Sequence, residues 1–261
     1  MGRAKTASGV LGYPETALSD AHRAVKYVRE SDQAATLMFV LAHGSLFTHT
    51  FRGDYPAASA QAQELFAVAD AKGALLWKAA AMFVQGCILG LTGRASDAVQ
   101  TSNSAITLYQ STGSIIYVPY FLSYLASAYA RLAEFKDAWR CIGEAMTMMK
   151  TTKEKWCEAD IYRTAGEIAL MSPEPDAAQA QGYFERALAV ARAQQAKSWE
   201  LRAAMSMARL WRDQGKRDEA RDLLAAVYGW FTEGFDTLDL KEAKALLDEL
   251  HAGHPAAQGT L

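Results

Sequence analysis

Small apolar residues recur along the chain at a nearly constant interval. Five alanines mark the pattern, at successive steps of 40, 40, 42 and 40 residues: Ala58, Ala98, Ala138, Ala180 and Ala220. Seven residues after each of them stands another small or aliphatic residue, and residues seven apart lie on the same face of an α-helix. Such a period is typical of helical-repeat proteins, in which each unit buries its apolar face only against its neighbours.

A helix-ending residue precedes the marker alanine in most units. Five residues before it, three units carry glycine (Gly53, Gly93 and Gly215) and one carries Ala133. Glycine readily adopts the left-handed backbone conformation that ends many helices. The fourth unit departs from the pattern at 171–175, where two prolines and a serine interrupt it. The pattern therefore predicts two helices per unit, joined by a short turn.

The expected helices form five pairs and a terminal cap. The pairs are 32–51 with 55–72, 74–92 with 95–112, 115–132 with 136–152, 155–171 with 176–195, and 198–214 with 217–232. A last helix, about 238–251, carries apolar residues at helical spacing with Lys and Glu between them, which is typical of a cap with a solvated outer face. The sequence predicts an all-α fold, an α-solenoid of about five hairpins.

The N-terminal part carries only half of a unit. Gly12 and Ala17 repeat the glycine-to-alanine step of five, but no first helix precedes them. A solenoid normally starts with a cap, so we expect the chain to be a piece of a longer protein. The uncovered half-unit would expose an apolar face at Leu18, Val25 and Val28, and such faces favour association. A homodimer through this half-repeat is therefore expected.

Three regions follow from these patterns. Residues 1–11 are expected to be a flexible N-terminus, 12–252 a superhelical repeat domain, and 253–261, which are rich in Gly, Pro and polar residues, a disordered tail.

Composition narrows the function classes. The chain is 51% hydrophobic and 21% charged, with a formal net charge of −2. A general nucleic-acid binder is usually basic, so we expect no nucleic-acid partner. No signal peptide is visible, and no uninterrupted apolar run reaches the roughly 18 residues of a membrane span. We expect a cytoplasmic protein without a membrane partner.

The metal-binding and nucleophilic residue types form no recognisable site. The three cysteines, Cys87, Cys141 and Cys157, include no Cys-x-x-Cys pair, and the five histidines show no ligand spacing. Reduced thiols packed as small apolar side chains are the expected state. The sequence predicts neither a metal nor a cofactor.

The turn segments resemble those of the tetratricopeptide repeat. Gly53-Asp54-Tyr55-Pro56 and the segment 133–138 carry its helix-turn signature, although that repeat usually has a period of 34. The C-terminal part, sharpest over 198–250, resembles the repeat region that follows the cyclase and ATPase modules of bacterial class III adenylate/guanylate cyclases. Similar arrays close other ATPase-linked transcriptional regulators.

This resemblance implies a regulatory array within a larger signalling protein. It carries over neither cyclase nor ATPase activity, because the chain has no Gly-x-x-x-x-Gly-Lys-Ser/Thr loop and no cyclase catalytic segment. The expected function is a non-catalytic scaffold whose partner is a protein, a peptide or the upstream domains of its own parent chain.

The resemblance also implies a concave face lined by the first helix of each pair. By position, the candidate binding residues on that face are His43, Phe47, Phe83, Tyr120, Ser123, Asp160, Arg163, Glu167, Arg202, Arg209 and Arg212. The early units supply aromatic groups and the late units supply charge, which suits an extended peptide with apolar anchors and an acidic end.

Two other functions remain open from the sequence. The same face, with aromatics nearby, is suited to enclosing a small-molecule effector, which would make the chain a sensor. Asp160 and Glu167 lie seven apart and form a carboxylate pair of the kind used in acid–base catalysis. No nucleophile, base and orienting group accompany them, and Arg163 between them indicates an ordinary ion-paired helix face, so we expect no enzyme activity.

Overall fold

The described part of the chain, residues 8–30 and 33–252 of a computed structural model, is helical and contains no β-strand. The elements are α2 (Pro14–Glu30), α3 (Ala34–His43), η1 (Gly44–His49), α4 (Thr50–Arg52), α5 (Tyr55–Ala71), α6 (Leu75–Leu91), α7 (Ala95–Ser111), α8 (Val118–Arg131), α9 (Phe135–Thr152), α10 (Glu158–Met171), α11 (Ala177–Ala193), α12 (Lys197–Asp213), α13 (Arg217–Tyr228) and α14 (Leu238–Ala252). The prediction of an all-α fold is confirmed, and the repeat-like arrangement fits an α-solenoid.

The periodic alanines lie where successive helices touch. All five are buried, at 0–1% exposure, because a methyl group lets two helix backbones approach closely. The glycines before them have positive φ angles (76° at Gly53, 87° at Gly93 and 79° at Gly215), as the left-handed helix ends require. Ala133 takes the same conformation at φ 60° without being glycine.

A second set of close approaches involves glycines in the first helices. A Cβ atom built on Gly166 in α10 would lie 2.4 Å from Cε1 of Phe184 in α11, whose side chain is fully buried. We expect Gly166→Ala to lower the free energy of unfolding by about 1–3 kcal/mol, because the phenyl group must shift within a packed core. Gly143 in α9 is the matched control, since nothing lies within 4 Å of a Cβ there.

Alanine at Gly143 should stabilise the protein by about 0.5–1 kcal/mol, because alanine restricts the unfolded chain and favours helix. Urea unfolding followed by circular dichroism measures both variants. Equal effects at the two positions would contradict the close α10–α11 packing.

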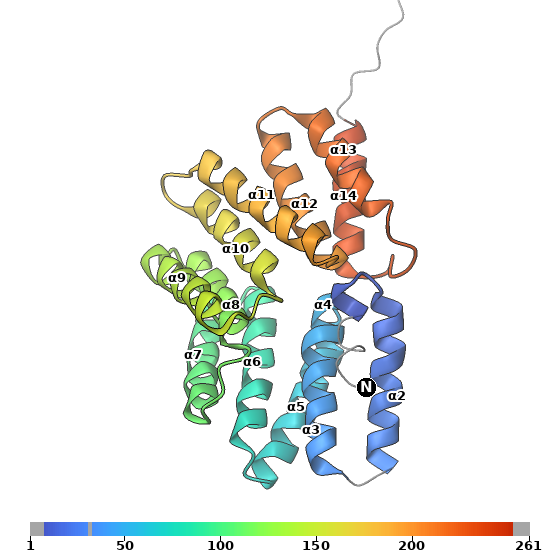
Figure 1. Cartoon of the computed structure of the whole chain (residues 1–261), viewed down its shortest axis with the longest axis vertical. Helices are drawn as coiled ribbons and strands as arrows, with labels where there is room; N and C mark the ends of the chain where they lie inside the picture. The colour runs from blue at the N-terminus through green and yellow to red at the C-terminus, as the bar shows by residue number, and fades with distance from the viewer. Residues whose placement is uncertain (1–7, 31–32, 253–261) are drawn as a thin grey trace, which may run out of the picture.

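The chain closes on itself. In Figure 1 the helices follow one another around the molecule from the blue N-terminal elements to the red α14, and the two ends of the path meet. The carboxylate of Glu233 accepts hydrogen bonds from the backbone N–H groups of Glu15 and Thr16, both at 3.0 Å, and Gly234 N–H donates to the Glu15 carboxylate at 2.9 Å. We call the closed path of α2–α14 the helix ring.

Further contacts join the same two regions. Arg52 forms an ion pair with Asp236 at 2.8 Å, and the side chains of Tyr13 and Trp230 pack edge to face with centroids 5.5 Å apart. The Ser198 hydroxyl donates to the carbonyl oxygen of Gly9 at 2.6 Å. The residues of the expected flexible N-terminus that the structure describes, 8–11, thus include a contact to α12. Residues 1–7 and the expected disordered tail, 253–261, lie outside the described residues.

The N-terminal helix is covered rather than open. Val25 and Val28 of α2 are buried, and Leu18 is half-buried. Two of the three residues on which the expected homodimer rested are therefore covered, because α2 packs against α3 and η1 within the same chain. The homodimer itself stays a prediction. The sequence pattern did not predict that α2 would be covered in this way. The covering helix comes from the following unit, residues 33–52, and not from a helix before α2.

The continuous helical stretch formed by α3, η1 and α4 is irregular and strongly apolar. Its middle turn, η1, is π-helical, a form that arises mostly as a single bulged turn and often at functional sites. The stretch Ala34–Arg52 is also long and apolar enough to cross a bilayer by length and composition, although polar residues interrupt it in the sequence. Of that stretch, 61% is buried inside the protein, as in a core helix.

Candidate functional site

The aromatic members of the predicted concave face form core rather than surface. Phe47, Phe83 and Tyr120 are at most 7% exposed, and Phe47 packs against Trp156 with centroids 5.4 Å apart. This corrects the expectation of an aromatic peptide groove in the early units. Closing the helix ring brings η1 and α4 against α8, α12 and the segment before α10, so these side chains fill the space between them.

His43 lies at the margin of the same cluster. Its Nε2 atom is 3.2 Å from the hydroxyl of Tyr117, and its Nδ1 atom is 2.8 Å from the carbonyl oxygen of Phe39. Burial lowers the pKa of His43, against the opposing effect of that carbonyl. The imidazole is therefore neutral at pH 7 and acts here as a packed aromatic group.

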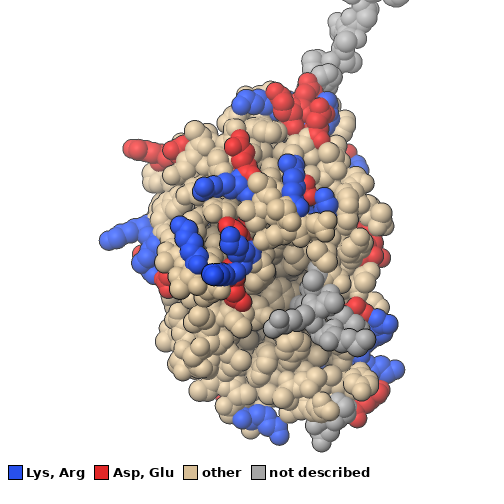
Figure 2. Space-filling view, in the orientation of Figure 1, with Lys and Arg blue, Asp and Glu red and all other residues tan. Residues whose placement is uncertain are grey.

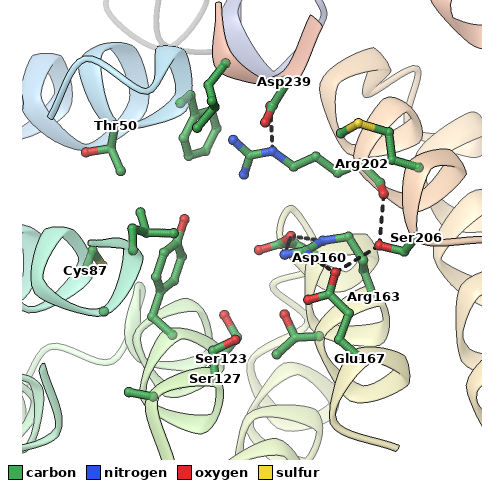
Figure 3. Close-up of a pocket in the computed structure, with 18 of the residues that line it drawn as sticks. Thr50, Cys87, Ser123, Ser127, Asp160, Arg163, Glu167, Arg202, Ser206 and Asp239 are labelled. Carbon is green, nitrogen blue, oxygen red and sulfur yellow. Dashed lines mark hydrogen bonds and ion pairs between the residues drawn. The ribbon is translucent and has the colours of Figure 1, made fainter. Parts of the chain in front are cut away.

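A pocket of about 290 Å³ remains at the centre of the helix ring. Side chains from α4, α5, α6, α8, α10, α12 and α14 line it, and Figure 3 shows them converging on one space. Six of the candidate residues predicted from the sequence lie in its wall: Ser123, Asp160, Arg163, Glu167, Arg202 and Arg209. The charged candidates of the late units other than Arg212 therefore lie on a common surface.

Arg163 organises the α10 side of the pocket. It donates from Nε to Asp160 at 2.8 Å and from Nη1 to Glu167 at 2.7 Å. The Asp160 side chain is only 2% exposed. Burial lowers the pKa of Arg163, but these two carboxylates outweigh it, so the net pKa is raised and the guanidinium stays charged.

Arg202 is the buried cation on the α12 side of the pocket. Its Nε donates to Asp239 of α14 at 2.7 Å, and its guanidinium lies 5.0 Å from the centroid of Phe51 and 5.3 Å from that of Trp199. Burial opposes the charge, but Asp239 and Asp160 raise the net pKa well above the ordinary value. A cation beside two aromatic side chains is stabilised by their π faces.

Hydroxyl groups lie beside these charged groups, and one of them forms a hydrogen bond with a charged group. The Ser206 hydroxyl donates to Glu167 at 2.9 Å, which ties α12 to α10. Tyr120 donates to the Tyr124 hydroxyl at 3.0 Å, and burial raises the pKa of Tyr124. Ser127 also lines the space. The pocket thus offers neutral donors and acceptors beside its ions.

The charges of the pocket wall balance. Four arginines line it (Arg131, Arg163, Arg202 and Arg209), and so do four carboxylates (Asp160, Glu167, Asp239 and Glu242). Arg209 pairs with Glu242 at 3.0 Å at the exposed rim. The outer surface in Figure 2 is similarly mixed, with positive and negative side chains interspersed on the face shown.

Arg212 is the one charged candidate that lies apart from the pocket. It forms ion pairs with Asp213 at 2.8 Å and with Glu249 of α14 at 3.1 Å, so it joins α12 to the terminal helix. Sequence reasoning in turn missed Asp239 and Glu242, which α14 brings into the wall. The terminal helix packs against α12 and α13, and the sequence pattern, which predicts it only as a cap, does not show that its acidic side chains face the arginines of α12.

The acidic side chains of the wall are each paired with an arginine. Among the residues that the structure describes, no three His, Cys, Asp or Glu side chains are grouped as metal ligands. The Asp160 and Glu167 carboxylates both face the same arginine. The arrangement is suited to binding by hydrogen bonds and charge pairing.

The three thiols should be unreactive in the folded protein. Cys87, Cys141 and Cys157 are at most 1% exposed, and burial raises the pKa of all three, that of Cys141 to about 11. Because the thiolate is the nucleophile, we expect Ellman's reagent at pH 8 to label no thiol in the native protein and all three in denaturant. Rapid labelling of Cys87 without denaturant would contradict the burial of its thiol at the pocket wall.

Comparison with known proteins adds a likeness of fold. No protein-family profile and no curated protein match the chain, whereas 31 chains of solved structures do. One is the crystal structure of BtubC (BKLC) from P. vanneervenii, with 17% sequence identity and a TM-score of 0.56. The match covers 95% of this chain and 96% of that chain. At this identity the likeness concerns the fold alone.

Proposed function

We propose that the chain is a non-catalytic regulatory module of the tetratricopeptide type that binds a small polar molecule in its central pocket. The observation that carries the proposal is the convergence of helices from both ends of the chain, α4 to α14, on one charged and hydroxyl-lined space. Binding sites of this kind combine a preformed cavity with a few placed polar groups.

The size of the pocket favours a small molecule over an extended peptide. Its volume of about 290 Å³ is near the lower limit of ligand pockets, about 300 Å³. The apolar anchors that a peptide would need, Phe47, Phe83 and Tyr120, are already packed against other core residues. The sensor alternative therefore has more support than the open groove.

The proposed parent is a bacterial signalling protein in which cyclase and ATPase modules precede this array. A ligand that touches α10, α12 and α14 together would favour the closed helix ring, since a ligand stabilises whichever state it binds better. The change in stability would then reach the preceding modules through α2, whose N-terminal end is bonded to residues 233 and 234.

A thermal-shift screen against a panel of polar metabolites tests the proposal. We expect at least one compound to raise Tm in a concentration-dependent way, because ligands that bind only the native state stabilise it. Ser127→Trp, which fills the pocket from α8, should abolish the shift. A panel without any effect, or a shift that survives Ser127→Trp, would contradict a ligand site at this place.

A protein-interaction role is the second candidate, and exposed apolar side chains favour it. Leu75, Ile115 and Ile116 are each 46–50% exposed, and Phe39 is 39% exposed. Clusters of exposed apolar residues often mark interaction sites. Co-purification with the cyclase and ATPase modules of the proposed parent, lost in Ile116→Glu and kept in the pocket variant Ser127→Trp, would support this role.

A further inference from the structure

We infer that the central pocket takes a small zwitterion, such as a free α-amino acid, whose carboxylate binds Arg202 and whose ammonium group binds Asp160 and Glu167. This inference rests on the proposed function and names the ligand class of the same site. It follows from the donors and acceptors that the pocket leaves open, from its charge balance and from its apolar wall.

The donor side is the guanidinium of Arg202. Its Nε is engaged with Asp239, and among the described residues its two Nη groups make no hydrogen bond. Figure 3 shows the guanidinium directed into the open space of the pocket. Arginine binds carboxylates in a bidentate manner through two parallel N–H groups. The free Nη groups thus form one half of a carboxylate site.

The acceptor side is the pair of α10 carboxylates. Arg163 bonds to Oδ1 of Asp160 and to Oε1 of Glu167, and Ser206 also donates to Oε1 of Glu167. The second oxygens, Oδ2 of Asp160 and Oε2 of Glu167, accept no hydrogen bond from any described residue. An ammonium group has three donors and no acceptor, so it matches two such oxygens.

The balance of charge distinguishes a zwitterion from simpler ions. A plain anion at Arg202 would also lie near Asp239 and Asp160, whose fields act on that guanidinium. A plain cation at Asp160 would face Arg163 and Arg202. Charges interact strongly where little water separates them, so a ligand that carries both signs meets favourable partners at each end and adds no net charge.

The remaining wall suits a modest apolar side chain. Phe51, Leu91 and Met205 line the pocket together with the charged groups. Methionine adapts to differently shaped neighbours, so side chains of more than one size can be accommodated. The volume of about 290 Å³ limits the ligand to a single amino acid or a compound of similar size.

Isothermal titration calorimetry with matched compounds tests the inference. The probes are free α-amino acids, their N-acetyl derivatives without the ammonium group, the corresponding amines without the carboxylate, and neutral polyols. We expect binding only by free amino acids. We also expect Arg202→Gln to weaken it about tenfold or more, because a bidentate charge-assisted pair is lost. Arg212→Gln, on the same helix but outside the pocket, is the control and should change affinity less than about threefold.

The possible outcomes distinguish a wrong ligand class from a wrong proposed function. Binding by N-acetyl derivatives, amines or polyols at equal affinity would overturn the zwitterion while leaving a ligand-binding pocket in place. No binding by any class in a broad metabolite panel would overturn the proposed function itself. If Arg202→Gln fails to fold, Arg202→Lys keeps the charge without the planar fork. Unchanged affinity in that variant would contradict a bidentate carboxylate site.

Discussion

Replacing Trp199 with alanine is expected to lower the free energy of unfolding by about 3–5 kcal/mol, as for other fully buried tryptophans. Trp199 is 1% exposed and is among the largest fully buried side chains. Its centroid lies 5.0 Å from that of Phe51 and 6.2 Å from that of Tyr120. It therefore joins α12 to helices from the first and third pairs, and its loss opens a cavity where the helix ring closes.

Trp230→Ala is the matched control for this change. Trp230 is 37% exposed and packs on Tyr13 and Phe231. Its removal should cost less than about half as much, since much of its surface already faces water. Urea unfolding curves with equal slopes give both values. A Trp199 variant no less stable than the Trp230 variant would contradict the position of Trp199 in a closed core.

The second large effect on stability is expected at the ion pair between Arg163 and Asp160 in the pocket wall. Arg163→Met should lower the free energy of unfolding by about 3–5 kcal/mol, because it removes the cation from a carboxylate, Asp160, that is 2% exposed. The double variant Asp160→Asn with Arg163→Met should be more stable than Arg163→Met alone, since no unpaired charge is then buried.

A double-mutant cycle in urea measures this coupling directly. The exposed pair Arg140 and Asp137 provides the control, with both side chains about half exposed, and its coupling should stay within about 0.2–1 kcal/mol. If Asp160→Asn with Arg163→Met is less stable than Arg163→Met alone, the carboxylate is not held by the arginine as described.

The helix boundaries were predictable because small residues recur for a local reason. A methyl group at Ala98 or Ala138 permits close helix contact, and a positive φ at Gly53 or Gly93 ends a helix. Both requirements act within one unit of about 40 residues, so they leave a periodic trace in the sequence. The expected pairs consequently match the observed elements to within a few residues.

The closure of the helix ring left no such trace. It depends on contacts between residues more than 180 positions apart, such as Arg52 with Asp236 and Thr16 with Glu233. Each contact joins one polar group to another far along the chain, and a single polar residue indicates no such partner in the sequence. The same closure packs Phe47 against Tyr120 and Trp156, which explains why the aromatic groove was wrongly expected.

The central claim is that the helix pairs close into a helix ring around the pocket, and one distance measurement tests it most directly. Spin labels would be placed at Ser19 on α2 and Thr232 after α13, two exposed positions beside the contact between the ends, in a background with alanine at the three buried cysteines. Double electron–electron resonance should give one short, narrow distance distribution. A broad distribution centred on long distances would show that the ends are apart and would contradict the closed arrangement.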